Sequence, residues 1–293
     1  MGVWLLWAIA FPMRQKLSGK LFEAGVDYIT VTCAELLHID RARRLALSLA
    51  EWELAANMLG RPFNANGYQG FKVGSLQYGE RDDGSMLRLS GDLAAKFWQR
   101  AYDVADNVTR IDLQCTYKVT EAPAVVVGRH YKELCRKKAK LKRGPEVSRI
   151  QKKSGGYTVY SGVRQSDRWG RCYDKEAQSK LPRYLGCVRY EEQFGNERAL
   201  KVATGIRRTS LSMNDIAVEV LRFFSERGAG VRSLQEQLDL AATAVDSSLC
   251  KRTSDITRKY QWLEKCVRPT LRMLAARGEL ELIEKALSLA LVR

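Results

Sequence analysis

The sequence is poor in histidine and proline and has no closely spaced cysteines, and each shortage excludes a class of protein. Its two histidines, His38 and His130, lie far apart, which excludes HExxH metalloproteases, C2H2 zinc fingers and the paired-histidine strand of many DNA-nicking enzymes. The sequence has only six prolines, which also excludes wholesale disorder and a collagen-like structure. The seven cysteines are odd in number and form no CxxC pair, so the sequence favours a reducing cytoplasm over a disulfide framework or zinc site.

Long apolar runs are also missing. The apolar stretch 2–11 is shorter than the ~20 residues that a membrane-spanning helix needs, so we expect no membrane segment. We interpret 1–24 as an N-terminal extension or as the first element of the core. What the chain has in excess is positive charge: 49 lysines and arginines face 33 acidic residues, a net charge of +16. Such an excess indicates a polyanionic partner, either nucleic acid or an anionic surface.

A large part of this charge lies in residues 130–153, where ten basic residues face two acidic ones. A solvated, partly helical segment would explain the run, but its density favours contacts with a phosphate backbone. The candidate DNA-binding residues are Arg136, Lys137, Lys138, Lys140, Lys142 and Arg143.

Hydrophobic periodicity predicts an α+β fold, with a largely antiparallel sheet and flanking helices over 25–205 and a helical C-terminal region over 206–293. No internal repeat is evident. Strands are predicted at 26–32, 108–119, 157–161, 171–175 and 185–194, with further short strands within 67–89. Helices are predicted at 40–59 and 93–105, and two more open near Ser212 and Ser254.

Three of these strands place reactive groups on a polar face. Asp112 alternates with apolar Ile111 and Leu113, Glu191 shares a face with Arg189, and Tyr173 shares a face with Arg171 and Lys175. A tyrosine, two carboxylates and several cations on one sheet suit the attack of a tyrosine hydroxyl on a phosphodiester. Because histidine is scarce, carboxylates would hold the metal, which favours Mg²⁺ or Mn²⁺. The simpler alternative is that Tyr173 is one of 12 tyrosines, placed on a half-buried strand.

Several segments resemble the replication initiation factor family, the rolling-circle initiators of small plasmids and filamentous phages, with related conjugative relaxases. Two central segments carry the specific motifs, and the outer ones are weaker. The central segments are YTVYSGVRQSDRWGRCYDKEAQ (157–178) and VRYEEQFGNERAL (188–200). The outer ones are VDYITVT (26–32), YGERDDGSMLRLSGDLAAKFW (78–98), VTRIDL (108–113) and WLEKCVRPTLRMLAARG (262–278).

The resemblance implies a nicking domain over 25–205, a metal-dependent nickase and a tyrosine that becomes linked to the 5′ end of the cut strand. Tyr173 matches the motif R-x-Y-D-K, and we rank it above Tyr160 and Tyr190 as the nucleophile. Arg171 and Lys175 would assist it. The metal ligands would be Asp112 in R-I-D-L, Glu191 in R-Y-E and Asp27, although an ion pair with a lysine or arginine explains Asp27 equally well.

Two positions depart from the family pattern. Val163 replaces a usual serine, and Thr116 stands where many members have a second acidic residue, which leaves fewer metal ligands. The implied partners are origin DNA, single-stranded or locally melted, a host helicase and polymerase, and a second copy of the chain in a homodimer. The implied location is the cytoplasm of a bacterial host. Two alternatives stay open: a conjugative relaxase with the same chemistry, and a non-catalytic, basic DNA-binding regulator.

Overall fold

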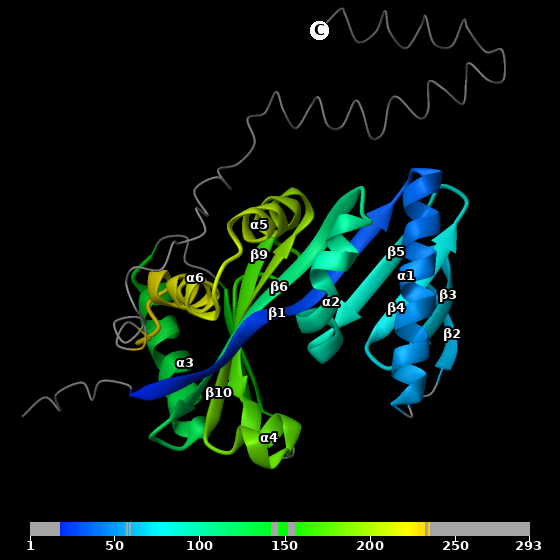
Figure 1. Ribbon diagram of the computed structural model, residues 1–293. Helices are drawn as coiled ribbons and strands as arrows, with labels where there is room; N and C mark the ends of the chain where they lie inside the picture. Colours follow the sequence, from blue (N-terminus) through cyan, green and yellow to red (C-terminus); the bar gives the residue numbers. More distant parts are fainter. Residues whose placement is uncertain are drawn as a thin grey trace, which may run out of the picture. The chain divides into compact units, whose positions relative to one another are not determined.

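The computed structural model describes residues 18–56, 58, 60–141, 146–151, 156–231 and 234. They form one ten-stranded antiparallel sheet with helices packed on it (Figure 1), which confirms the predicted α+β class. Within these residues no helix is long and apolar enough to cross a bilayer. The predicted helix at Ser254, most of the C-terminal region and residues 1–17 lie outside the described ranges.

The strands follow the order β2-β3-β4-β5-β1-β6-β10-β9-β8-β7 across the sheet. The strands are β1 (Gly19–Cys33), β2 (Gly60–Ala65), β3 (Tyr68–Val73), β4 (Leu76–Arg81), β5 (Gly84–Ser90), β6 (Asn107–Val119), β7 (Val147–Gln151), β8 (Tyr157–Ser161), β9 (Arg168–Asp174) and β10 (Cys187–Gly195). The helices are α1 (Leu36–Ala55), α2 (Gly91–Asp103), α3 (Pro123–Ala139), α4 (Lys175–Ser179), η1 (Pro182–Tyr184), α5 (Asn196–Thr209) and α6 (Met213–Glu226).

Most predicted elements are confirmed, with shifted ends. Helix α1 begins at Leu36 and ends at Ala55, four residues before the predicted end, and Gly60 and Pro62 belong to β2. Strand β2 lies at the edge of the sheet, where a proline can be accommodated without breaking a ladder between two neighbours. Strand β1 begins at Gly19, so residues 19–24 are part of the sheet, and α5 spans the expected boundary at residue 205.

The sheet consists of two halves with the same succession of elements, a repeat that the sequence did not reveal. In the first half, β1 is followed by α1, four strands and α2; in the second, β6 is followed by α3, four strands and α5. Each half pairs its first strand with its last, and the remaining strands extend outward to an edge.

The halves meet where β1 and β6 pair. Tyr28 lies opposite Asp112, and Thr30 lies opposite Arg110, so a twofold relation about Ile29 and Ile111 exchanges the two strands. Register shifts leave one extra residue on each strand at matching positions, Asp27 on β1 and Thr109 on β6. The second half differs mainly by inserting α4 and η1 between β9 and β10, where the first half has only a tight turn between β4 and β5.

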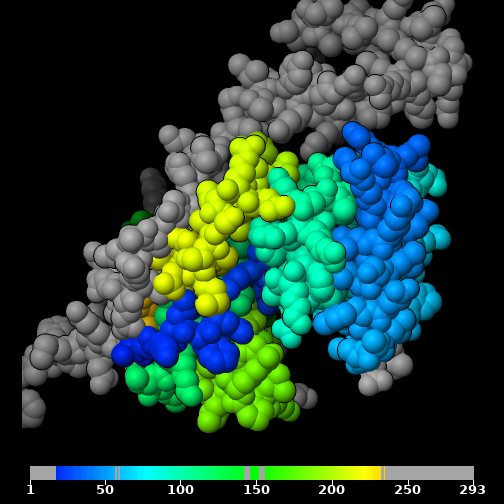
Figure 2. Space-filling view, in the orientation of Figure 1, coloured from blue at the N-terminus to red at the C-terminus, as the bar shows by residue number. Residues whose placement is uncertain are grey.

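Helices cover one face of the central strands. Helix α2 packs on β1 and β5, α5 packs on β6 and β10, and a hydrogen bond of 3.0 Å joins Tyr102 on α2 to Thr204 on α5. Figure 2 shows α2 between α1 and α5 on this surface. Helices α3 and α6 contact Tyr190 of β10, His130 at 2.8 Å and Phe224 at 5.4 Å between ring centroids. The neighbours of Tyr190 on β10, Arg189 and Glu191, therefore point to the other face of the sheet.

Candidate active site

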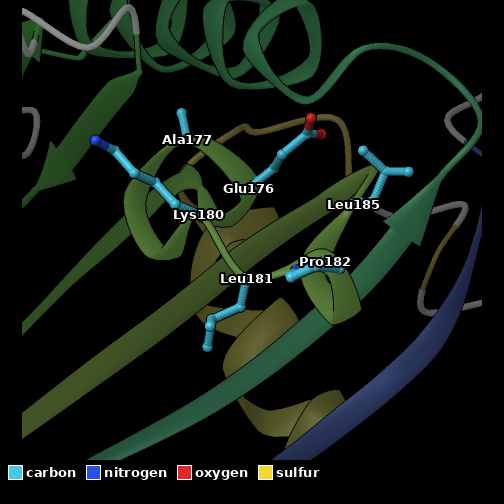
Figure 3. Close-up of a pocket in the computed structure, with 6 residues that line it drawn as sticks. All are labelled: Glu176, Ala177, Lys180, Leu181, Pro182 and Leu185. Carbon is cyan, nitrogen blue, oxygen red and sulfur yellow. The ribbon is translucent and has the colours of Figure 1, made fainter.

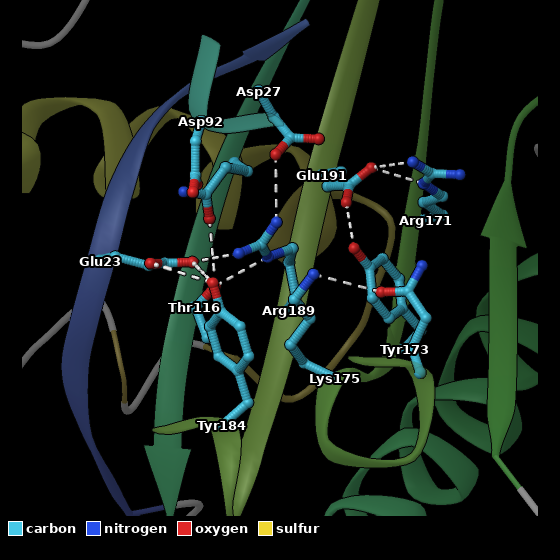
Figure 4. Close-up of polar contacts among 12 residues, drawn as sticks. Glu23, Asp27, Asp92, Thr116, Arg171, Tyr173, Lys175, Tyr184, Arg189 and Glu191 are labelled. Atoms are coloured by element: carbon cyan, nitrogen blue, oxygen red, sulfur yellow. Dashed lines mark hydrogen bonds and ion pairs between the residues drawn. The ribbon is translucent and has the colours of Figure 1, made fainter. Parts of the chain in front are cut away.

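The register of three strands gathers the predicted reactive residues on one face of the sheet. Glu191 on β10 lies opposite Gln114 on β6 and opposite Arg171 on β9, and Arg189 lies opposite Tyr173. Directly paired residues in a sheet share a face, and Asp112, two residues from Gln114, shares it as well. The predicted alternation of these strands is thereby confirmed: Figure 4 shows Arg171, Tyr173, Arg189 and Glu191 gathered together, and α3 and α6 contact Tyr190 on the opposite face.

Tyr173 and Glu191 are in direct contact. The Tyr173 hydroxyl donates a hydrogen bond to Oε1 of Glu191, and the Arg171 guanidinium binds Oε2 of the same carboxylate. Tyr173 and Glu191 are 3% and 2% exposed, so this contact is shielded from water. Burial, and then the negative charge of Glu191, raise the pKa of Tyr173 well above its usual value. The phenol is therefore protonated at rest and has a carboxylate oxygen in place to accept its proton.

Arg189 connects the two halves of the molecule. Its guanidinium binds Glu23 of β1, lies 3.1 Å from Oδ1 of Asp27 and donates to Oγ1 of Thr116 at 2.9 Å. It is 4% exposed, so these contacts compensate a buried charge. The ion pair that we considered as the alternative role of Asp27 is thus present. Thr116, the departure from the family pattern, accepts this hydrogen bond.

Asp112 is held by its neighbour on the same strand. The Arg110 guanidinium donates to both carboxylate oxygens, at 2.8 and 2.6 Å, and its carbon lies 3.9 Å above the Tyr28 ring. Burial raises the pKa of Asp112. Burial, followed by the negative charge of Glu191, raises the pKa of Asp27 to about 6, and Asp112 contributes in the same direction. The three carboxylates are therefore close enough to repel one another.

A hollow of about 280 Å³ lies beside this cluster; Asp27, Arg171, Tyr173 and Arg189 are among its lining residues, and Asp112 and Glu191 are not. Strand β5 pairs with β1 only from Tyr28 onward, which leaves room for Gly91 and Asp92 at the start of α2 beside the open edge of β1. On the other side, the segment from α4 to η1 brings Lys175 over the Tyr184 ring, with Nζ 4.9 Å from its centroid. Burial, and then the charge of Arg189, lower the pKa of Lys175. The hollow is lined by carboxylates, cations and the edge of Tyr173.

A second hollow, of about 360 Å³, lies on α4 and η1 (Figure 3). Its lining residues are Glu176, Ala177, Lys180, Leu181, Pro182 and Leu185. The Glu176 carboxylate there accepts a hydrogen bond of 2.9 Å from the backbone of Gly186, which holds the segment against the start of β10. This hollow lacks the tyrosine, arginine and paired carboxylates of the first, so we interpret it as structural.

The oxygen donors Asp27, Asp112 and Glu191 suit a hard divalent cation, and their mutual repulsion would be relieved by one. Each of them is engaged by an arginine, Asp112 by Arg110, Asp27 by Arg189 and Glu191 by Arg171, so a cation would have to displace at least one of these guanidinium groups. Among the described residues, the three-residue group with ligand atoms within 4.8 Å is a different one: Glu35, His38 and Asp106. There the Asp106 carboxylate accepts hydrogen bonds from the backbone of Ala34 and Glu35 at the start of α1, which gives it a capping role.

The other candidate tyrosines lie elsewhere. Tyr160 is on the same face as Tyr173, since it pairs with Arg171 across β8 and β9. Tyr190 is fully buried on the opposite face, where it bonds His130.

The basic run also lies away from Tyr173. Helix α3 packs on β8 and β9 from the Tyr190 face, and its last turn carries Arg136, Lys137 and Lys138, with Lys140 just after it. Lys142 and Arg143 lie outside the described residues.

Sequence reasoning missed several members of the site. Glu23, Gln114 and Tyr184 were not singled out, and Arg189 was noted only for its place on a polar face. Their roles depend on which strands are neighbours: Arg189 meets Glu23 because β6 and β1 follow β10 in the sheet. The one signal in the sequence that pointed to Arg189 was its place two residues before Glu191, on the same face of the strand.

Comparisons with known proteins agree with the resemblance. The family described as replication initiation factor matches residues 106–288. One similar solved structure is that of a rolling circle replication initiator protein from Geobacillus stearothermophilus, with 20% identity over 68% of this chain and 84% of that chain and a TM-score of 0.48. No curated protein matches. The family match spans more than half of the chain and includes the strands that carry Asp112, Tyr173 and Glu191, and the chain therefore belongs to the replication initiation factor family.

Proposed function

We propose that this protein initiates rolling-circle replication by nicking, and later rejoining, one DNA strand at an origin, with Tyr173 as nucleophile. Family membership supports a role in replication initiation. The observation that carries the chemical proposal is the buried contact of the Tyr173 hydroxyl with Glu191, next to Arg171 and to a hollow, lined in part by Tyr173, that can receive a phosphodiester.

The reaction exchanges one phosphoester bond for another. The bond between the Tyr173 oxygen and phosphorus forms as the bond between phosphorus and the 3′ oxygen breaks. The cut strand then has its 5′ phosphate on the protein and a free 3′-OH for a polymerase. Because the phosphotyrosine link keeps the bond energy, the reverse attack by a 3′-OH rejoins the strand.

The residues around Tyr173 have separate tasks in this proposal. Glu191 orients the hydroxyl and lies where it can accept its proton. Arg171 and Lys175 stabilise the phenolate and the charge that develops on the phosphate oxygens. Asp112, Glu191 and Asp27 would hold Mg²⁺ or Mn²⁺, which when bound polarises the scissile phosphate. Without a metal, Arg110 binds Asp112, Arg189 binds Asp27 and Arg171 binds Glu191, and these contacts limit the mutual repulsion of the carboxylates.

The basic end of α3 has a different task. It lies behind the sheet from Tyr173, so we propose that Arg136, Lys137, Lys138, Lys140, Lys142 and Arg143 contact the duplex next to the nick, not the strand being cut. Such phosphate contacts position the DNA without taking part in the reaction.

The test uses a labelled single-stranded origin oligonucleotide with the full-length protein. With Mn²⁺ we expect a covalent adduct whose labelled peptide contains Tyr173, and with EDTA we expect none. Adduct formation in EDTA would contradict the metal requirement, and a labelled peptide without Tyr173 would contradict the nucleophile. The absence of any adduct or nicking with Mn²⁺ would favour the non-catalytic alternative.

A further inference from the structure

A cluster of two aromatic rings and an arginine lies beside the candidate active site and has no role in the chemistry proposed above. The rings of Tyr160 on β8 and Trp169 on β9 are 5.8 Å apart at their centroids and inclined by 38°. The Arg164 guanidinium lies over both, 4.4 Å from the Tyr160 centroid and 5.8 Å from that of Trp169. Trp169 is 7% exposed and supports the half-exposed Tyr160 from below.

The turn after β8 brings the arginine back over the rings. Gly162 adopts a φ of +97°, and a Cβ there would lie 3.1 Å from Cβ of Trp169. Only glycine fits such a turn easily. Arg164 itself is exposed, and the Ser166 hydroxyl fixes the turn by bonding the backbone oxygens of Val163 and Arg168. An exposed cation is thus placed above two packed aromatic rings.

The cluster is one strand away from the proposed reaction. Tyr160 pairs with Arg171 across β8 and β9, one strand spacing of ~4.8 Å away, so it shares the face of Tyr173 on β9 and of Glu191 on β10, the next strand. Arg171 in turn binds Glu191. A strand whose scissile phosphate reaches Tyr173 would therefore bring a neighbouring base over Tyr160.

We propose that the Tyr160–Trp169 surface stacks one base of the single-stranded DNA next to the scissile phosphate, in the place that the Arg164 guanidinium occupies. This rests on the proposed function and adds a binding subsite to it. The base displaces the guanidinium from the ring, and Arg164 then pairs with an adjacent phosphate. Stacking on aromatic rings accepts any base, so the subsite fixes the position of the strand and not its sequence.

The chain contains a matched control on the same strand. Tyr157 of β8 also lies under an arginine, with the Arg149 guanidinium 5.2 Å from its centroid, but it points to the opposite face, where Arg149 also covers Tyr131 of α3. A general loss of aromatic–arginine stacking would affect both positions alike. A base-stacking subsite predicts an effect at Tyr160 alone.

Binding is measured by fluorescence anisotropy on a labelled single-stranded oligonucleotide in EDTA, where no metal-dependent reaction occurs. Tyr160→Phe should bind as the wild type does, and Tyr160→Ala should bind roughly 5- to 150-fold more weakly. Tyr157→Ala should bind as the wild type does, and circular dichroism checks that all variants fold. Arg164→Ala should lower the slope of log K against log salt by about 0.7, the value for one single-strand phosphate contact.

An abasic scan locates the base. A single abasic position near the nick should weaken wild-type binding by the same factor as Tyr160→Ala. The same abasic position should weaken binding of the Tyr160→Ala variant little further, because both changes remove the same contact. Three outcomes would each overturn the subsite. They are wild-type affinity in Tyr160→Ala, equal losses of affinity in Tyr160→Phe and Tyr160→Ala, and an abasic profile that is the same in Tyr160→Ala as in the wild type. Loss of the covalent adduct in Tyr160→Phe would instead make Tyr160 the nucleophile. Failure of Tyr173 to form the adduct, with the binding results intact, would overturn only the proposed function.

Discussion

The two halves of the sheet have the same topology and different contents. Where the second half has Tyr173 and Glu191, the matching positions of the first half, aligned through their strand pairings, hold Arg81 and Met86. Arg171 corresponds in the same way to Gly79, and Asp112 to Thr30. The common topology therefore does not specify the chemistry. It provides a central pair of strands, and the side chains of one half supply the reactive groups.

The first half nevertheless completes the site. Its strand β1 supplies Glu23 and Asp27 to the buried Arg189, and its helix α2 supplies Gly91 and Asp92 to the hollow. The second half adds α4 and η1, which place Lys175 and Tyr184 over the same hollow. The second half carries the proposed nucleophile, and both halves contribute residues to the hollow beside it.

The largest effect is expected at Glu191. Glu191→Gln keeps the size of the side chain and removes its charge, so nicking should slow by about 10²- to 10³-fold, as when a single electrostatic group is removed from an active site. Single-turnover nicking with Mn²⁺ measures this. The matched control is Met86→Leu at the corresponding position of the first half, which should nick normally. Equal rates for Glu191→Gln and the wild type would show that the two halves do not differ as we describe.

The link between the halves should dominate stability. Arg189→Met leaves Glu23 and Asp27 without their buried partner, so the free energy of unfolding should fall by about 3 kcal/mol in urea titrations. The control is Arg43→Met, which breaks an exposed ion pair with Glu80 and should lower the free energy of unfolding far less, because solvent screens exposed charges. Similar losses for both variants would mean that the Arg189 contacts do not join the halves.

A third difference concerns the first helix of each half. The last turn of α3 carries Arg136, Lys137 and Lys138, and the last turn of α1 carries no basic residue. Replacing these three and Lys140 with Gln should flatten the salt dependence of log K for duplex origin DNA by about 3.6, since each duplex phosphate contact contributes about 0.9. Nicking at saturating DNA should change little. An unchanged slope would mean that the basic end of α3 is only solvated.

A fourth difference concerns Glu192, whose counterpart in the first half is the buried Leu87. Burial raises the pKa of Glu192 to about 8, above the 4.5 of an exposed glutamate, even though Arg168 binds it. The folded state thus keeps a proton that the unfolded state loses, and stability should fall from about pH 5 to 8, by at most about 1.36 kcal/mol per pH unit. Urea titrations across this range should show that Glu192→Gln removes this slope. A slope that persists in the variant would assign it to another group.

The sequence predicted the local features of this site well. The alternation of polar and apolar residues correctly placed Asp112 and Ile111 on different faces of the sheet, and likewise Glu191 and Tyr190. Successive side chains of a strand point to opposite faces, so this follows directly from strand geometry. Two helices were missed although they had signals: Pro123 at the start of α3, and the spacing of Ala199, Val202 and Ile206 in α5.

What the sequence could not reveal depends on strand order. The repeat cannot be detected in the sequence because matching positions share a place in the sheet but not a residue type, as Glu191 and Met86 illustrate. The pairing of Arg189 with Glu23 requires β1 to be two strands from β10, which no local pattern encodes. The position of the basic run behind the sheet follows from the packing of α3 on β8 and β9, and that too depends on the order of strands.

The most direct test of the central claim removes one hydroxyl group. Tyr173→Phe and Tyr160→Phe, each incubated with labelled origin strand and Mn²⁺, differ only in which tyrosine of the same face lacks its oxygen. We predict that Tyr173→Phe binds the strand and forms no covalent adduct, and that Tyr160→Phe forms the adduct as the wild type does. An adduct with Tyr173→Phe would contradict the assignment of the chemistry to the contact between Tyr173 and Glu191.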